Sequence, residues 1–105
     1  MSGYLVQLIL PVYDNDGAPI GRPLFAQVRR ELTERFGGVT AYTRAPAEGT
    51  WESPEGDIHR DDVVVVETMT EQLDRAWWAD YARELAARFR QQTVIIRALT
   101  YESLS

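Results

Sequence analysis

The chain has 105 residues, the size of one domain, with a net charge of -5 and neither cysteine nor lysine. These absences exclude disulfides, thiolate catalysis, Schiff-base lysines and phosphate-binding loop lysines. The acidic charge disfavours nucleic acid, and no run approaches the roughly 20 apolar residues that a membrane span needs. We therefore expect a single cytoplasmic domain over residues 1–105 with no nucleic-acid or membrane partner. All 11 basic residues are arginine, which suggests GC-rich bacterial coding.

The first third of the chain predicts a strand, a loop and a helix. Residues 4–12, YLVQLILPV, alternate along a strand that is apolar on both faces. The following YDNDGAPIG begins like a calcium loop but lacks the later ligands, so we interpret it as a solvated loop. Helical spacing then runs from Pro23 to Phe36, with Glu31 and Arg35 at the i, i+4 spacing of an ion pair. A glycine pair after Phe36 ends the helix.

The rest of the chain predicts two strands, a second helix and a last strand. Residues 39–44, VTAYTR, form one strand, and the β-branched run from Val63 forms the next. Thr68 and Glu71 have capping-box spacing and are predicted to introduce the second helix. Residues 93–102, TVIIRALTYE, form the last strand. The apolar stripe of the second helix comprises Leu73, Trp77, Trp78, Tyr81, Leu85 and Phe89.

This strand, helix, strand, strand, helix, strand order is that of the ferredoxin-like α+β fold. Such a domain has an antiparallel four-stranded sheet with both helices on one face. Its first and third strands are central, and here they are the most apolar strands. Their second apolar face would be left in water, which usually marks an interface. We therefore predict a homodimer in which two sheets pack face to face.

The segment 49–62, GTWESPEGDIHRDD, holds the only histidine of the chain. Ser53–Gly56 has the composition of a type I turn, which predicts a hairpin. Strand alternation places Asp57, His59 and Asp61 on one face, where a carboxylate could tune the imidazole as a general base. We favour the alternative, in which these charges keep an exposed hairpin soluble. A single histidine cannot build a two-histidine metal site, and no metal or cofactor is expected.

Two further groups of side chains are candidates for ligand binding. Tyr42 and Arg44 share one face of their strand, where they could bind an anion or cover a sheet edge, and we favour the edge. Trp77 and Trp78 point about 100° apart on the helix. We expect Trp77 in the core and Trp78 at its margin or on a dimer partner. The alternative is that they wall a ligand pocket between helix and sheet.

The run from Phe36 to Val66 resembles a family of small bacterial α+β domains whose activity is unassigned. Its pattern is R-F, a short G-[LV]-T strand, G-x-W, a G-x-[IL] turn and a β-branched strand. The resemblance implies a ferredoxin-like or dimeric α+β barrel fold. Related dimeric barrels that are enzymes are often cofactor-free oxygenases or isomerases. The matching residues are Arg35, Phe36, Gly38, Thr40, Gly49, Trp51 and Gly56.

These observations leave three functions open. The first is a homodimer that binds a small molecule or a partner protein. The second is a cofactor-independent oxygenase or isomerase with His59 as base, assisted by Asp57 or Asp61, in a site shaped by Trp51 or Tyr42. The third is a structural or assembly role without a ligand.

Overall fold

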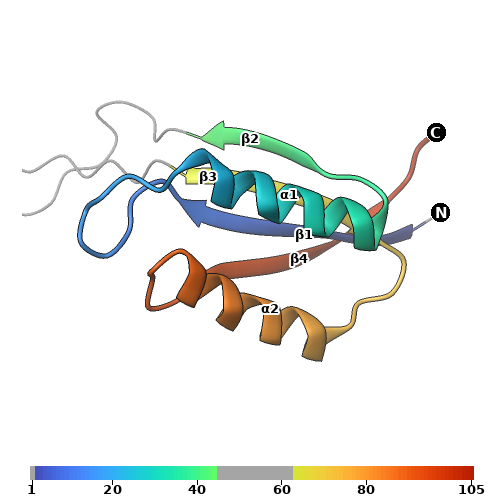
Figure 1. Cartoon of the computed structure of the whole chain (residues 1–105). Coiled ribbons are helices and arrows are strands. Elements are labelled where there is room, and N and C mark those ends of the chain that lie inside the picture. Colours follow the sequence, from blue (N-terminus) through green and yellow to red (C-terminus); the bar gives the residue numbers. More distant parts are fainter. Residues whose placement is uncertain (1, 45–62) are drawn as a thin grey trace, which may run out of the picture.

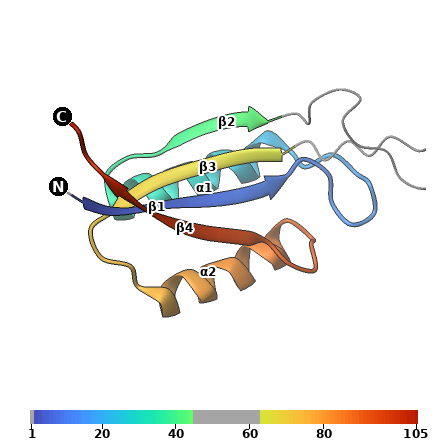
Figure 2. The ribbon, with the colours of Figure 1, turned by 180° about the vertical axis from the view of Figure 1, so that it is seen from behind.

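The computed structural model describes residues 2–44 and 63–105 and confirms the ferredoxin-like βαββαβ order (Figure 1). A four-stranded antiparallel sheet lies behind two helices, and the view from behind shows that both helices cover the same face (Figure 2). In chain order the elements are β1 (Ser2–Pro11), α1 (Arg22–Phe36), β2 (Thr40–Arg44), β3 (Val63–Thr70), α2 (Arg75–Arg88) and β4 (Ile95–Glu102).

The strands lie in the order β2-β3-β1-β4, so β1 and β3 are central, as predicted from their apolar content. Leu8 of β1 pairs with Val66 of β3 on one side and with Ile96 of β4 on the other. Because side chains alternate along a strand, this register places all three on the face that the helices cover. Leu8 and Val66 are fully buried there.

Helix α1 begins and ends as predicted. Pro23 stands in its first turn, and Gly37 closes it with a left-handed φ of 89° while its N–H donates to the Thr33 carbonyl at 2.8 Å. The buried stripe consists of Phe25, Val28 and Leu32, which face the sheet. Phe25 meets Phe89 edge to face at 5.3 Å, which ties α1 to the end of α2.

The predicted capping box at the start of the second helix is wrong. Thr68 continues β3 opposite Val6 of β1, and its hydroxyl donates to the Gly38 carbonyl at 2.7 Å. The N-cap is instead Asp74, whose carboxylate accepts the Trp77 backbone N–H at 3.0 Å. β3 therefore runs through Thr68 to Thr70, because β1 offers both threonines an antiparallel partner.

The loop between β1 and α1 is held by local hydrogen bonds. The Asp14 carboxylate accepts the backbone N–H groups of Asp16 and Ala18, each at 2.9 Å, which is an ordinary turn for Asp. Asp16 also forms an exposed ion pair with Arg90 at 2.8 Å. Asp14 therefore holds the turn, and Asp16 joins the loop to the residues that follow α2. Over residues 2–44 and 63–105, no helix is long and apolar enough to cross a membrane.

Candidate functional site

Nine side chains of the sheet face opposite the helices form three rows across β3, β1 and β4, and we call these nine the open face. It consists of Met69, Leu5 and Leu99 in the first row, Glu67, Gln7 and Arg97 in the second, and Val65, Ile9 and Ile95 in the third. Met69 and Ile95 are each 60% exposed and Leu99 is 46% exposed, although all three are large and apolar. Val65 is buried between its neighbours on β2 and β1. The open face is therefore apolar above and below one polar row.

Side-chain hydrogen bonds join the polar row across β3, β1 and β4 and connect it to Tyr42 on β2. Gln7 donates its amide N–H to the Glu67 carboxylate, and its carbonyl oxygen accepts the Nε–H of Arg97 at 2.7 Å. The Tyr42 hydroxyl of β2 donates to the same carboxylate at 3.3 Å. The amide of Gln7 thus separates one anion from one cation, and the row carries no net charge.

The predicted pair of Tyr42 and Arg44 stands on an edge strand, where these residues pair with Val65 and Val63 of β3. Tyr42 is 43% exposed and donates to a carboxylate, which fits a residue covering the sheet edge. The side chain that Tyr42 contacts is therefore the anion Glu67. Binding of an anionic ligand by Tyr42 and Arg44 remains a prediction.

The candidate catalytic residues lie outside the described residues. This holds for Asp57, His59 and Asp61, and for Trp51. The hairpin expected over 49–62 lies there as well. A cofactor-independent enzyme with His59 as base therefore stays a prediction. Within residues 2–44 and 63–105, no group of three or more His, Cys, Asp or Glu side chains could hold a metal ion.

The expected roles of the two tryptophans are reversed. Trp78 is 6% exposed and stacks on Phe36 at 5.1 Å, so it belongs to the core. Trp77 is only half-buried, stacks on Tyr81 at 4.9 Å and carries the Arg35 guanidinium 4.1 Å above its ring. Arg35 therefore lies over an aromatic ring and not beside Glu31 as the i, i+4 spacing predicted. Trp78 is the residue that turns its ring toward the sheet.

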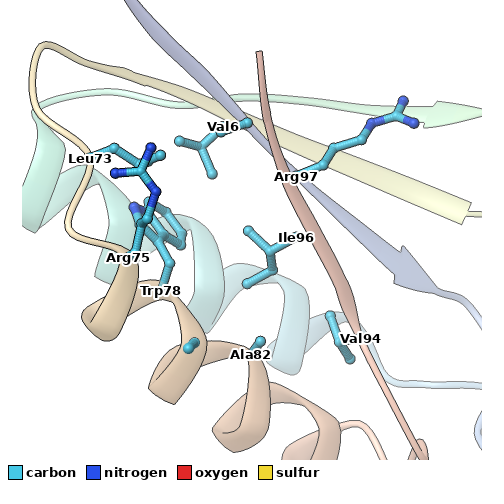
Figure 3. Close-up of a pocket in the computed structure, with 10 residues that line it drawn as sticks. Val6, Leu73, Arg75, Trp78, Ala82, Val94, Ile96 and Arg97 are labelled. Carbon is cyan, nitrogen blue, oxygen red and sulfur yellow. The ribbon is translucent and has the colours of Figure 1, made fainter. Parts of the chain in front are cut away.

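Trp78 also lines a groove of about 290 Å³ between α2 and β4 (Figure 3). Three small residues of the helix and strand, Ala79, Ala82 and Ala98, leave the room for it. The guanidinium of Arg75 lies beside Trp78 at one end of the groove, whereas the side chain of Arg97 points away from it (Figure 3). The remaining walls are Val6, Leu73, Val94 and Ile96. An apolar groove with one cation is suited to a small organic anion.

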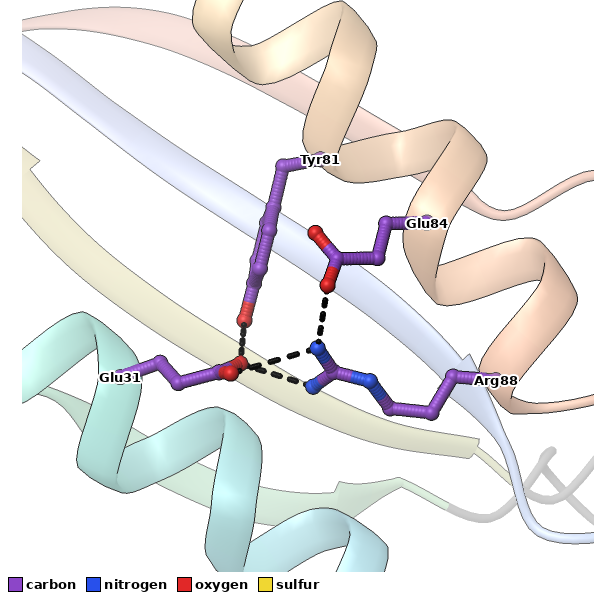
Figure 4. A network of polar contacts seen from close by, with 4 residues as sticks. All are labelled: Glu31, Tyr81, Glu84 and Arg88. Atoms are coloured by element: carbon purple, nitrogen blue, oxygen red, sulfur yellow. Dashed lines mark hydrogen bonds and ion pairs between the residues drawn. The ribbon is translucent and has the colours of Figure 1, made fainter.

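A charged network that the sequence analysis did not identify joins the two helices (Figure 4). Glu31 of α1 accepts hydrogen bonds from the Tyr81 hydroxyl at 2.8 Å and from both terminal nitrogens of Arg88 at 2.7 and 3.2 Å. Arg88 also pairs with Glu84, one turn earlier on α2, at 2.9 Å. Glu31 and Arg88 are 57 residues apart in sequence, so no local spacing signals their contact.

The network shifts the pKa of each of its main members. Burial alone would raise the pKa of Glu31, but hydrogen bonds from Arg88 and Tyr81 outweigh it and hold the pKa below its ordinary value. Burial and the bond to Glu31 raise the pKa of the Tyr81 phenol. The bond to Glu31 also raises the pKa of Arg88. All three groups therefore keep their usual protonation states at neutral pH. The network thus acts as a structural contact that holds α1 to α2.

Comparison of the chain with protein-family models, with curated proteins and with solved structures finds no match in any of the three. The resemblance to a bacterial α+β family therefore stays a prediction.

Proposed function

We propose that this chain is an association module that works as a homodimer, with two open faces packed against each other. The observation that carries the proposal is the exposure of Met69, Ile95 and Leu99 on one continuous sheet surface. Exposed apolar surface on both sides of the polar row costs free energy in water, roughly in proportion to its area. Packing two such sheets about 10 Å apart would remove both surfaces from solvent.

The polar row is compatible with burial in such an interface. Burying a lone charge is expensive, whereas a charge that is paired or hydrogen-bonded costs much less. Glu67 and Arg97 are both hydrogen-bonded to Gln7, and their charges cancel. A second copy of the same face therefore meets no net charge.

We expect Leu99→Glu to prevent dimerisation. Leu99 is half exposed in the protomer, so a carboxylate is tolerated there by the fold, but in the dimer it would be buried without a partner. An unpaired buried charge costs several kcal/mol, so the dimer dissociation constant should rise at least about 100-fold. The measurement is mass by light scattering over a range of micromolar concentrations.

The matched control is Leu104→Glu, which makes the same change at a residue that is 93% exposed and off the sheet. It should dimerise like the unchanged chain. A monomeric unchanged chain at micromolar concentration would defeat the proposal, and an unaffected L99E dimer would place the interface elsewhere.

A second candidate function is the binding of a small organic acid in the groove between α2 and β4. Its apolar walls suit an alkyl or aryl chain, and the Arg75 guanidinium suits a carboxylate (Figure 3). We expect hexanoate to raise the melting temperature of the unchanged chain, and Arg75→Gln to remove most of that shift. Hexan-1-ol should raise it less, because it offers Arg75 no charge.

The control is Arg83→Gln, an exposed arginine of the same helix that is paired with Asp80. It lowers the net positive charge of α2 equally and should keep the hexanoate shift. An equal shift in R75Q and R83Q would show that hexanoate does not bind through Arg75, and the candidate function would be dropped.

A further inference from the structure

We infer that the two-fold axis of this dimer runs close to the direction of β1 and passes over Gln7, so that Glu67 of each protomer faces the partner's Arg97. This inference rests on the proposed homodimer and adds its register. In this register Glu67 and Arg97, the charged residues of an otherwise apolar surface, pair with each other across the interface.

The symmetry of face-to-face packing allows few arrangements. A two-fold axis that turns one sheet face onto the other must lie in the plane between the sheets. If it runs along the strands, it keeps each position along the strand and reverses the order of strands, so β3 faces the partner's β4. If it runs across the strands, each strand faces its own copy with its rows reversed.

Charge distinguishes these arrangements. An axis along β1 sets Glu67 opposite the partner's Arg97, twice per dimer, with the Gln7 amides meeting at the centre. An axis across the strands that passes over the polar row sets the two Glu67 carboxylates against each other and the two Arg97 guanidinium groups likewise. Like charges buried together raise the energy of an interface, whereas opposite charges with hydrogen bonds are tolerated. The first arrangement is therefore favoured.

A sideways shift of the axis is less favourable. If the axis lay between β1 and β3, Arg97 would face the partner's Thr40, because Thr40 continues the polar row on β2. The guanidinium would then lose its facing carboxylate, and Glu67 would face only the partner's Gln7. A slip along the strands is excluded, because a two-fold axis in that direction leaves the position of every row along the strand unchanged.

The apolar rows fit the same axis. Leu99, at 46% exposure in the protomer, faces the partner's Met69, at 60%. Ile95, at 60% exposure, comes over the partner's third row, where Val65 is already buried among its neighbours. Leu5 meets its own copy, because it lies on β1 near the axis. If the strands of the two sheets cross at about 30°, the two Leu5 side chains are displaced from each other by less than one strand spacing, about 4.8 Å.

Crosslinking tests the register without disturbing the polar row. The chain contains no cysteine, so an introduced thiol is the only one. Packed sheets lie about 10 Å apart, beyond the usual Cα span of a disulfide, so a short bismaleimide is the suitable reagent. We expect most of the Leu5→Cys variant to crosslink as a dimer. Glu34→Cys, exposed on the helix side, should give only the yield of random collision.

A mixture of two variants provides an independent test. Glu67→Cys mixed with Arg97→Cys should crosslink between the two variants, because one Glu67–Arg97 contact stays intact while the thiols occupy the other. Each variant alone should give only the collisional yield, since equivalent positions lie on opposite sides of the axis. Light scattering of both variants checks that they still associate.

The outcomes separate the register from the dimer itself. If the chain dimerises and Leu99→Glu abolishes the dimer, but Leu5→Cys crosslinks no better than Glu34→Cys, the axis is elsewhere and the inference fails alone. Strong crosslinking of Glu67→Cys with itself would indicate the axis across the strands and also overturn it. If the unchanged chain is monomeric, the proposed function fails first.

Discussion

Replacement of Trp78 by alanine is expected to lower the free energy of unfolding by about 3–5 kcal/mol, the usual cost of truncating a fully buried aromatic residue. Trp78 is 6% exposed and contacts Phe36 and Tyr81 as well as its neighbour Trp77. Truncation therefore removes contacts to α1 and within α2 and leaves a cavity that rigid neighbours cannot fill. Urea unfolding at a fixed chain concentration measures the change.

The adjacent Trp77 is the matched control, because Trp77→Ala is the same chemical change one residue away. Trp77 is only half-buried and contributes its stack on Tyr81 and its contact with the Arg35 guanidinium. Its truncation should cost about 1–2 kcal/mol. Equal costs for the two variants, or a greater cost for W77A, would contradict the placement of Trp78 in the core.

The two tryptophans show what a helical pattern can predict and what it cannot. The stripe from Leu73 to Phe89 located the buried side of α2 correctly, because 3.6-residue periodicity is a property of one helix. Two adjacent residues at the border of that stripe differ by 100° in direction. Which of them points inward depends on how the helix is rotated against the sheet. That rotation is set by the buried cluster that Tyr81 and Leu85 share with residues of the sheet and of α1.

The fold itself was predictable because its main signals are local. Alternation in β1 and the β-branched run of β3 predicted two strands that are apolar on both faces, and this identified them as central. The same alternation predicted an apolar face opposite the helices. The capping box at Thr68 was also a local signal, but pairing with β1 outweighed it, since Thr68 and Thr70 each gain a place in the sheet.

The polar row of the open face and the charged network between the two helices could not be predicted from the sequence. Predicting them requires the strand register and the identity of partners far away in the chain. Gln7, Glu67 and Arg97 lie up to 90 residues apart in sequence and meet only because three strands align them. Glu31 has a locally spaced arginine in Arg35, yet it pairs with Arg88. Spacing along one helix cannot reveal a partner on another helix, so these contacts leave no local signal in the sequence.

Glu31→Gln is expected to destabilise the fold by about 1–2 kcal/mol at pH 7, because Arg88 keeps a partly buried charge and loses its charged acceptor. Glutamine retains the shape of the side chain and an oxygen for the Tyr81 hydroxyl. The variant thus removes mainly the charge. About a third of the Glu31 side chain is exposed, and solvent screening keeps the effect at this modest size.

The pH dependence of this effect has a definite sign. The folded pKa of Glu31 lies below its ordinary value of 4.5, so the unfolded chain binds the proton first as pH falls. The stabilisation by the carboxylate is therefore complete above pH 4.5 and is lost as the pH falls through the folded pKa. The difference between the unchanged chain and E31Q should shrink over that acid range, as measured by urea unfolding at a series of pH values.

Glu84→Gln is the matched control, because Glu84 pairs with the same Arg88 but is 62% exposed. An exposed i, i+4 pair contributes only about 0.3–0.5 kcal/mol, so this variant should cost much less than E31Q at pH 7. If the two glutamine variants cost the same, or if the E31Q difference persists unchanged at acid pH, the charge of Glu31 is not what holds α1 to α2. The expected result instead locates that stabilisation in the interhelical Glu31–Arg88 pair, on the covered face of the sheet and away from the open face. E31Q should therefore weaken the fold while leaving the register of the proposed dimer unchanged.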